Sequence, residues 1–309
     1  MRILFWGTPD FATPPLRALV GEGFDVVGVV TQPDRPRGRS RSQLDPSPVK
    51  VVAMEEGIPV LQPERPRGPE FVQALRDLAP DLSVVVAYGH ILPKEVIDLP
   101  PRGTLNIHAS LLPALRGAAP IQAAIAQGLE ETGVTIMRMV PALDAGPVLH
   151  VLATPIEPDE TGGELTLRLS ELGAAALIEA LALLELGEAV ERPQDDAQAT
   201  YARKVEREHA HVDWAASAID VARRIRAYDP RPGAWSAVHG TEVRLYGARA
   251  ISERAGASGV VLEAGEPGLI IACGEGAVAI REVHPAGKRR MAALDWVQGR
   301  GVAVGDRWG

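Results

Sequence analysis

The alternation of apolar runs with helical segments in the first half of the chain constrains the fold most strongly. Short β-rich runs such as RILFWG at 2–7, FDVVGVVT at 24–31 and LSVVVAYG at 82–89 alternate with segments of helical pattern. Strands that alternate with helices indicate a parallel sheet covered on both faces, which is why its strands are apolar along their whole length. We therefore expect an α/β fold with a doubly wound, mostly parallel, Rossmann-like sheet, which binds ligands at the carboxyl ends of its strands.

The remaining elements of this first half follow from the same patterns. We expect helices at about residues 11–21, 49–56 and 69–78, one that begins near residue 119, and a long helix from about residue 164 to the stop signal Gly187. Further strands are IPVLQ at 58–62, TLNIH at 104–108, GVTIMRMV at 133–140 and GPVLHVLATPI at 146–156, the last two joined by a hairpin at PALDAG.

The second half has a different pattern. Residues 190–208 are polar and lack a sustained core pattern, which predicts a linker between an N-terminal domain at 1–189 and a C-terminal domain at 209–309. SAIDVARRIRAY at 217–228 predicts an amphipathic helix, and strands punctuated by glycine run from Trp235 to about His284. Several short strands with regular turns indicate a smaller β-barrel domain, similar to an oligonucleotide-binding fold.

Composition narrows the class of protein. Apolar residues make up 46% of the 309 residues and charged residues 23%, which is typical of a globular chain. The start MRILFWGTPDF fits neither a signal peptide nor a membrane span, so we expect a cytoplasmic protein. We also expect a monomer.

The charge is distributed unevenly along the chain. Residues 1–190 hold 15 basic against 24 acidic residues, a net of −9, and residues 191–309 hold 17 against 16, a net of +1. The second half is therefore the more favourable to a polyanionic partner.

Two classes of cofactor site lack their sequence patterns. The first strand-turn-helix junction, FWGTPDF, has only Gly7 of a glycine-rich fingerprint, so we expect no nucleotide cofactor there. The single cysteine, Cys273, lies in a strand-like run and reads as a buried core thiol, which excludes a disulfide and a multi-cysteine metal site. The sequence EHAH at 208–211 has no third ligand in evidence, so we expect no metal.

The strand TLNIH carries two polar side chains at positions of equal parity, where apolar residues would be usual. Asn106 and His108 can therefore reach one point at the end of the strand that faces the ligand crevice. Spacing alone leaves open a satisfied core amide and imidazole. Asp144, in the turn-rich loop after the next strand, favours the functional interpretation because a carboxylate there can orient His108. Asn, His and Asp together suit acyl transfer to an amine, in which amide donors stabilise an oxyanion and His with Asp manages protons.

These residues lie in segments that resemble a known family. TLNIHASLLPALRGAAPIQAAI is similar to the Asn-x-His and Ser-Leu-Leu-Pro signature of the 10-formyltetrahydrofolate-dependent formyltransferases, and VTIMRMVPALDAGPVL to their segment with the catalytic aspartate. FWGTPDFA, VVTQPDRPRGR, PSPVK, VVAYGHILP, VDWAASAIDVARRIRAYDPRPGAW and PAGKRRM resemble, in order, the methionyl-tRNA formyltransferases over essentially the whole length. At Ala114 and Leu115 the chain departs from its relatives, which more often carry a basic and an aromatic residue there.

The resemblance implies a reaction and a role for each matching residue. The family transfers a formyl group from 10-formyltetrahydrofolate to the α-amine of initiator methionyl-tRNA, and Asn106, His108 and Asp144 match its catalytic residues. The implied folate-binding residues are Ser110, Leu111, Leu112, Pro113, Tyr88, Gly89 and Ile91. The implied tRNA-binding residues are Arg35, Arg37, Arg39, Arg41, Lys50, Lys288, Arg289 and Arg290.

Three alternatives remain. Sugar-nucleotide formyltransferases share the three catalytic residues, but the arginine-rich loop at 35–41 favours a tRNA acceptor. A glycinamide ribonucleotide enzyme would need no second domain. A tRNA-binding protein without catalysis is disfavoured because Asn106, His108 and Asp144 are all present.

Overall fold

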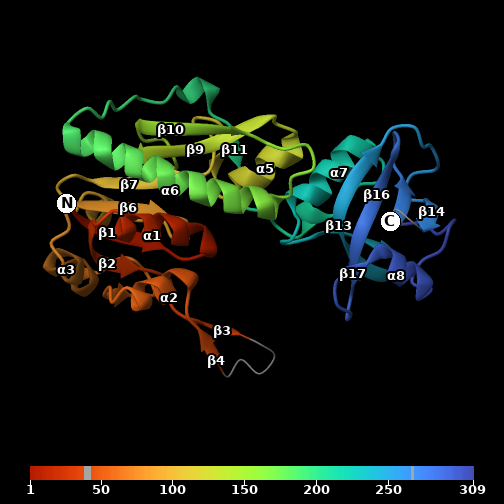
Figure 1. The fold of residues 1–309 in the computed structure, drawn as a ribbon, viewed down its shortest axis with the longest axis horizontal. Helices are drawn as coiled ribbons and strands as arrows, with labels where there is room; N and C mark the ends of the chain where they lie inside the picture. Colours follow the sequence, from red (N-terminus) through yellow and green to blue (C-terminus); the bar gives the residue numbers. More distant parts are fainter. Residues whose placement is uncertain (38–42, 266–267) are drawn as a thin grey trace. The chain divides into compact units, whose positions relative to one another are not determined.

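The computed structural model describes residues 1–37, 43–265 and 268–309. The contacts within the chain divide it into two compact units. The first unit holds residues 1–117, 132–154 and 166–201, and the second holds residues 118–131, 155–165 and 202–309. Figure 1 shows both units with their helices and strands labelled.

A seven-stranded sheet forms the centre of the first unit, with the order β10-β9-β7-β6-β1-β2-β5. The pairs β1–β2, β1–β6, β2–β5 and β6–β7 are parallel, and β7–β9 is antiparallel, so the expected mostly parallel sheet is confirmed. The strands are β1 (Arg2–Gly7), β2 (Asp25–Val30), β5 (Val60–Leu61), β6 (Leu82–Val86), β7 (Thr104–His108), β9 (Glu131–Arg138) and β10 (Val148–Pro155).

Helices cover both faces of this sheet, as its apolar strands require. One face packs α3 (Pro69–Asp77) and α4 (Lys94–Ile97) in a core around Trp6 and Leu75. On the other face α6 (Gly162–Leu186) lies along β7 and β9, where the packing is close: a Cβ on Gly173 would stand 3.1 Å from a methyl group of Ile107 (Figure 1). Two further helices are α1 (Thr13–Gly21), which follows the 3-10 turn η1 (Asp10–Ala12), and α2 (Pro48–Glu55).

Short pairs of strands extend the first unit beyond the central sheet. The strands β3 (Arg35–Arg37) and β4 (Gln43–Asp45) pair antiparallel, so the part of the arginine-rich loop that the structure describes, residues 35–37, is a strand of a hairpin (Figure 1). The strand β8 (Arg116–Gly117) pairs with β11 (Tyr201–Ala202), and the 3-10 turn η2 (Asp196–Gln198) precedes β11. Three-residue strands carry too little periodicity to be recognised from sequence.

The second unit contains an antiparallel sheet, as expected for the C-terminal domain. Its strands follow the order β12-β13-β16-β15-β14, with β17 paired to β16, and the adjoining pairs are antiparallel. The strands are β12 (Ala234–Val238), β13 (Thr241–Ile251), β14 (Val261–Gly265), β15 (Gly268–Ala272), β16 (Ala277–Pro285) and β17 (Met291–Ala292). The helices are α5 (Pro120–Gln127), α7 (Ala218–Ala227) and α8 (Ala293–Gln298), and η3 (Glu208–Ala210) is a 3-10 turn.

The described parts of the chain contain neither a membrane-spanning helix nor a cluster of metal-ligating side chains. Within residues 1–37, 43–265 and 268–309, no helix is both long and apolar enough to span a bilayer. In the same ranges no three His, Cys, Asp or Glu side chains gather as metal ligands would.

Candidate active site

Strand β7 presents two different faces. Leu105 and Ile107 are buried, and Ile107 faces Gly173 of α6. Because side chains alternate along a strand, Asn106 and His108 point to the opposite face. Asn106 is half-buried and His108 is 5% exposed, so the amide is the more accessible of the two.

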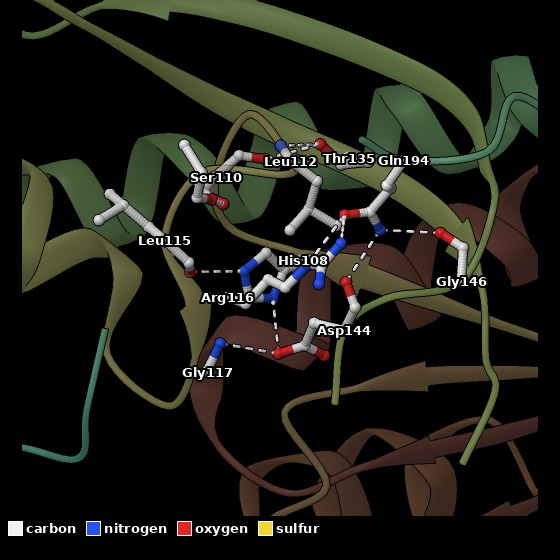
Figure 2. A network of polar contacts seen from close by, with 11 residues as sticks. His108, Ser110, Leu112, Leu115, Arg116, Gly117, Thr135, Asp144, Gly146 and Gln194 are labelled. Atoms are coloured by element: carbon white, nitrogen blue, oxygen red, sulfur yellow. Dashed lines mark hydrogen bonds and ion pairs between the residues drawn. The ribbon is translucent and has the colours of Figure 1, made fainter. Parts of the chain in front are cut away.

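Two partners hold the imidazole of His108 through different nitrogens. Nε2 lies 3.0 Å from the carbonyl oxygen of Leu115, and because a carbonyl can only accept, Nε2 carries a proton and donates it (Figure 2). Nδ1 lies 3.8 Å from Oδ2 of Asp144, beyond the usual hydrogen-bond range of about 2.7–3.2 Å. The contact with Asp144 is therefore not a hydrogen bond, and it becomes an ion pair only when the ring is protonated; Nδ1 is the ring nitrogen left to exchange a proton.

Both partners of His108 come from residues with unusual backbone angles. Leu115 has φ +59° and Asp144 has φ +47°, both in the left-handed region that disfavours residues with a side chain by roughly 1–2 kcal/mol. The Asp144 carboxylate also accepts a hydrogen bond at 2.8 Å from the backbone N–H of Gly117. Strained backbone at a functional site persists only where the surrounding contacts hold it.

Gln194 supplies such contacts, and sequence reasoning missed it because it lies in the predicted linker. Its Nε2 donates to the carbonyl oxygens of Asp144 at 2.9 Å and Gly146 at 2.8 Å. Its Oε1 accepts from Nε of Arg116 at 3.1 Å and from Nη2 at 2.8 Å (Figure 2). The only signal was the polar run PQDDAQAT, which reads equally well as a solvated segment.

Arg116 is a buried cation, 3% exposed. Its Nη2 lies 2.7 Å from Oδ1 of Asp196. Burial by itself would lower the pKa of Arg116, but the hydrogen bonds and charge interactions of Asp196 and Tyr201 together outweigh it and raise the pKa above its usual value. The guanidinium therefore stays charged while it ties β8 to the segment after α6.

The turn at 110–113 is built from internal hydrogen bonds. The Ser110 hydroxyl donates to the carbonyl of Ala114 at 2.6 Å. The Thr135 hydroxyl donates to the carbonyl of Ser110 at 2.7 Å and accepts from the N–H of Leu112 at 3.1 Å. These bonds leave Leu111, Leu112 and Pro113 half-buried, as an apolar turn beside His108 (Figure 2).

The segment at 88–91 follows β6, the parallel neighbour of β7, so both segments lie at the same edge of the sheet. Tyr88 is 1% exposed and packs edge-on against Trp6, so its ring belongs to the core, and burial raises its pKa to about 12. Its carbonyl accepts from Nε2 of Gln32 at 2.9 Å. Gly89 has φ +87°, and a Cβ there would stand 2.4 Å from Gln32. Ile91 is 89% exposed and presents its side chain to solvent.

The cations of the hairpin differ in their surroundings. Lys50 lies at the hairpin base, where its Nζ is 2.6 Å from Oδ2 of Asp34 and donates to Oε1 of Gln62 at 2.8 Å. Arg35 donates to Oε1 of Gln32. Arg37 is in β3, whereas Arg39 and Arg41 lie outside the described residues. Lys50 is therefore a structural link as well as a cation.

The basic residues at 288–290 also differ in their surroundings: two are exposed to solvent and one is ion-paired. Lys288 and Arg289 are exposed in the turn that joins β16 to β17. Arg290 contacts Asp229 at 3.2 Å and Glu282 at 2.5 Å, and its guanidinium lies 3.9 Å from the centre of the Tyr246 ring. Burial raises the pKa of Asp229, against the attraction of Arg290.

Known proteins match this chain in sequence over most of its length. A sequence model described as formyl transferase matches residues 1–181, and one described as formyl transferase, C-terminal domain, matches residues 204–301. The chain is 47% identical over 309 residues to the methionyl-tRNA formyltransferase of Geotalea daltonii, covering 100% of this chain and 98% of the relative.

Solved structures share the fold at lower identity. HypX from Aquifex aeolicus in complex with tetrahydrofolic acid has a TM-score of 0.67 and 24% identity; the match covers 98% of this chain but only 48% of HypX. WlaRD, a sugar 3N-formyl transferase, has a TM-score of 0.69 and 18% identity, with 94% of this chain and 99% of WlaRD covered. A sugar 3N-formyl transferase thus shares this architecture.

Proposed function

The chain belongs to the formyl transferase family, and on that premise we propose that it formylates the α-amine of initiator methionyl-tRNA, with 10-formyltetrahydrofolate as the donor. The observation that carries the choice of acceptor is the 47% identity to a methionyl-tRNA formyltransferase over all 309 residues. The product is N-formylmethionyl-tRNA for translation initiation. We expect the protein to act as a cytoplasmic monomer.

In this reaction the amine attacks the formyl carbon, a carbon–nitrogen bond forms to methionine, and the bond from that carbon to N10 breaks. The half-buried amide of Asn106 is placed to donate to the oxyanion, a contribution of about 3–4 kcal/mol for a well-oriented donor. Nδ1 of His108 accepts the proton that leaves the amine and then donates it to N10 of the folate. The Asp144 carboxylate stabilises positive charge on His108 across 3.8 Å.

The folate donor would lie between the turn at 110–113 and the segment at 88–91. Half-buried Leu111 and Leu112 and exposed Ile91 supply apolar surface for a flat ring system. The ring of Tyr88 is in the core, so its share of this wall is its backbone and that of Gly89. No protein group in this scheme requires a metal.

The tRNA would be bound by cations of both predicted domains, 1–189 for catalysis and 209–309 for further tRNA contacts. The arginine-rich segment suits phosphates and unpaired bases of the acceptor end through Arg35, Arg37, Arg39 and Arg41. Exposed Lys288 and Arg289 suit direct phosphate contacts. Lys50 and Arg290 contribute charge while they hold the hairpin base and Asp229.

An acceptor competition tests the proposal. The purified protein is given 10-formyltetrahydrofolate with initiator methionyl-tRNA and an amino-sugar nucleotide at equal concentrations. We expect formyl label on the tRNA alone. The sugar nucleotide is the relevant competitor because WlaRD, a sugar 3N-formyl transferase, shares the fold. Label on the sugar nucleotide alone would refute the tRNA assignment while leaving the formyl-transfer chemistry intact.

A further inference from the structure

Residues 194–200, which we call the 194–200 segment, contact two loops beside His108. The first loop is residues 115–117, and the second is residues 144–146. Thr200 contacts the first loop: its Oγ1 accepts from the N–H of Leu115 at 2.8 Å, and its carbonyl accepts from the N–H of Arg116 at 2.8 Å. Gln194 contacts the second loop by donating to the carbonyls of Asp144 and Gly146. One short segment therefore fixes the separation between the two partners of His108.

Gln194 uses the full capacity of its side chain in this position. A carboxamide has two N–H donors and an oxygen that accepts two hydrogen bonds. The donors go to two carbonyls of the Asp144 loop, and the oxygen accepts twice from Arg116 (Figure 2). Among side chains of this length, only the carboxamide combines two N–H donors with an oxygen that accepts twice, so the full set of four hydrogen bonds is specific to glutamine.

Arg116 links Gln194 to the residues on both sides of the His108 imidazole. It lies between Leu115, whose carbonyl accepts from Nε2 of His108, and Gly117, whose N–H donates to the Asp144 carboxylate. A shift of Arg116 relative to the Asp144 loop would therefore change the surroundings of both ring nitrogens together.

The strained backbone lies where this segment makes its contacts. Leu115 and Asp144 both have positive φ, and each is hydrogen-bonded to the 194–200 segment: the N–H of Leu115 donates to Thr200, and Gln194 donates to the carbonyl of Asp144. A strained loop relaxes when its external contacts are removed. The Asp144 carboxylate would then move relative to Nδ1, from which it is now 3.8 Å away.

We propose that Gln194 is a positioning residue of the formyl transfer: through Arg116 and the Asp144 loop it sets the distance and direction of the Asp144 carboxylate from His108. It touches no substrate in this scheme. The inference rests on the proposed function, and it adds a residue of the predicted linker to the catalytic machinery.

The test is Gln194→Glu, which keeps the size of the side chain and its acceptor for Arg116 but turns the two donors to carbonyls into an oxygen that repels them. We expect kcat to fall about 10- to 100-fold, the scale of a misplaced catalytic group, while KM for tRNA and for folate changes less than about twofold. We also expect the kcat–pH profile to shift by at least about half a unit because the field at His108 changes.

Gln198→Glu is the matched control. Gln198 lies in the same segment, is exposed, and donates only to Asp195 within the described residues, so the same chemical change reaches neither loop. Its kcat and pH profile should stay within about twofold and a few tenths of a unit of wild type. A Gln194→Glu protein with wild-type kcat and pH profile, or with losses that follow the fraction unfolded in circular dichroism, would overturn the proposal.

A measurement without substrate separates this inference from the proposed function. Imidazole ¹⁵N shifts of His108, identified by their loss in His108→Gln, report the tautomer and the neighbouring charge. We expect them to change in Gln194→Glu and to stay as in wild type in Gln198→Glu. Unchanged shifts would refute the positioning role, whereas changed shifts in a protein that formylates no tRNA would refute only the acceptor.

Discussion

His108 is fixed at one nitrogen and open at the other. Nε2 donates to the Leu115 carbonyl at 3.0 Å, which prevents rotation of the ring, while Nδ1 faces Asp144 without a hydrogen bond. A base that is oriented by one hydrogen bond keeps its second nitrogen for the reaction. Asn106, two positions earlier, brings the amide to the same face of β7.

Single substitutions at these positions should affect turnover and leave tRNA binding nearly unchanged. For Asn106→Ala and His108→Ala we expect kcat to fall at least about 100-fold, the scale of a lost oxyanion donor or proton carrier. Single-turnover kinetics measure the chemical step, and filter binding measures tRNA affinity. Turnover within a few-fold of wild type would return both residues to a structural role.

Asp144→Asn separates charge from structure. Asparagine keeps an oxygen that can accept from Gly117 but lacks the charge that faces Nδ1 of His108. We expect a lower kcat with little loss of stability in urea unfolding. A variant that loses stability and activity in parallel would show that Asp144 acts by holding the loop.

Arg290 and Arg289 are adjacent, but the structure separates their roles. Arg290→Ala leaves the Asp229 side chain, which is 8% exposed, without its cation. We expect a loss of about 2 kcal/mol at pH 7, reduced from that of a fully buried pair because the Arg290 side chain is 39% exposed. Since burial raises the pKa of Asp229, the loss is present while Asp229 is ionised and disappears as the pH falls through that raised pKa.

Urea unfolding between pH 7 and pH 4 measures this dependence. Arg289→Ala is the control, for which we expect a change within about 0.5 kcal/mol at each pH. An Arg290→Ala loss that is independent of pH would mean that packing on Tyr246, at 3.9 Å, outweighs the ion pair.

Among the elements, the β3–β4 hairpin depends on a polar network at its base. Lys50 and Gln62 both contact Asp34, at 2.6 and 2.7 Å, and Gln62 also donates to the carbonyl of Gln32 at 2.9 Å. Gln32 in turn donates to the carbonyl of Tyr88. The hairpin that would receive tRNA and the segment that would enclose folate are therefore joined by one chain of hydrogen bonds.

The Asp34 carboxylate should stabilise this network in a pH-dependent way. Hydrogen bonds from Lys50 and Gln62 lower its pKa, so its contribution is present above the unfolded-state pKa and is lost as the pH falls through the lowered value. We expect Asp34→Asn to cost about 1–2 kcal/mol at pH 7 and much less at pH 3, measured by urea unfolding. Asp98→Asn, which breaks an exposed pair with Lys94, should cost under about 0.5 kcal/mol. Equal losses for Asp34→Asn at both pH values would contradict the charge argument.

Sequence patterns predicted long elements well and short ones poorly. The strands β1, β2, β6 and β7 and the long helix α6 lie where the apolar periodicity indicated. The four-residue α4, the six-residue α8 and the three-residue strands of the hairpin were not predicted, because one turn or one pair of residues shows no period.

For the whole molecule, charge distribution governs how a tRNA would be bound. The net charge is −8, so affinity for a polyanion must come from local patches and should fall steeply with salt. Arg39→Ala with Arg41→Ala should raise KM for tRNA and reduce the slope of log KM against log salt by about two, with KM for folate unchanged. Arg76→Ala, an exposed arginine of α3, is the control. A change in folate KM alone would contradict a tRNA role for the hairpin.

The sequence by itself determined the layered sheet, the shared face of Asn106 and His108, and the family, because these depend on local periodicity and on motifs that are contiguous in the chain. Only the tertiary structure decided what holds them. Gln194 meets Asp144 across 50 positions and Arg116 across 78, and Lys50 and Arg290 proved to be paired with Asp34 and Asp229. The sequence pattern around a polar side chain is the same whether the side chain is solvated or buried, because the partner that would pair with it is distant in the chain and is brought near only by folding.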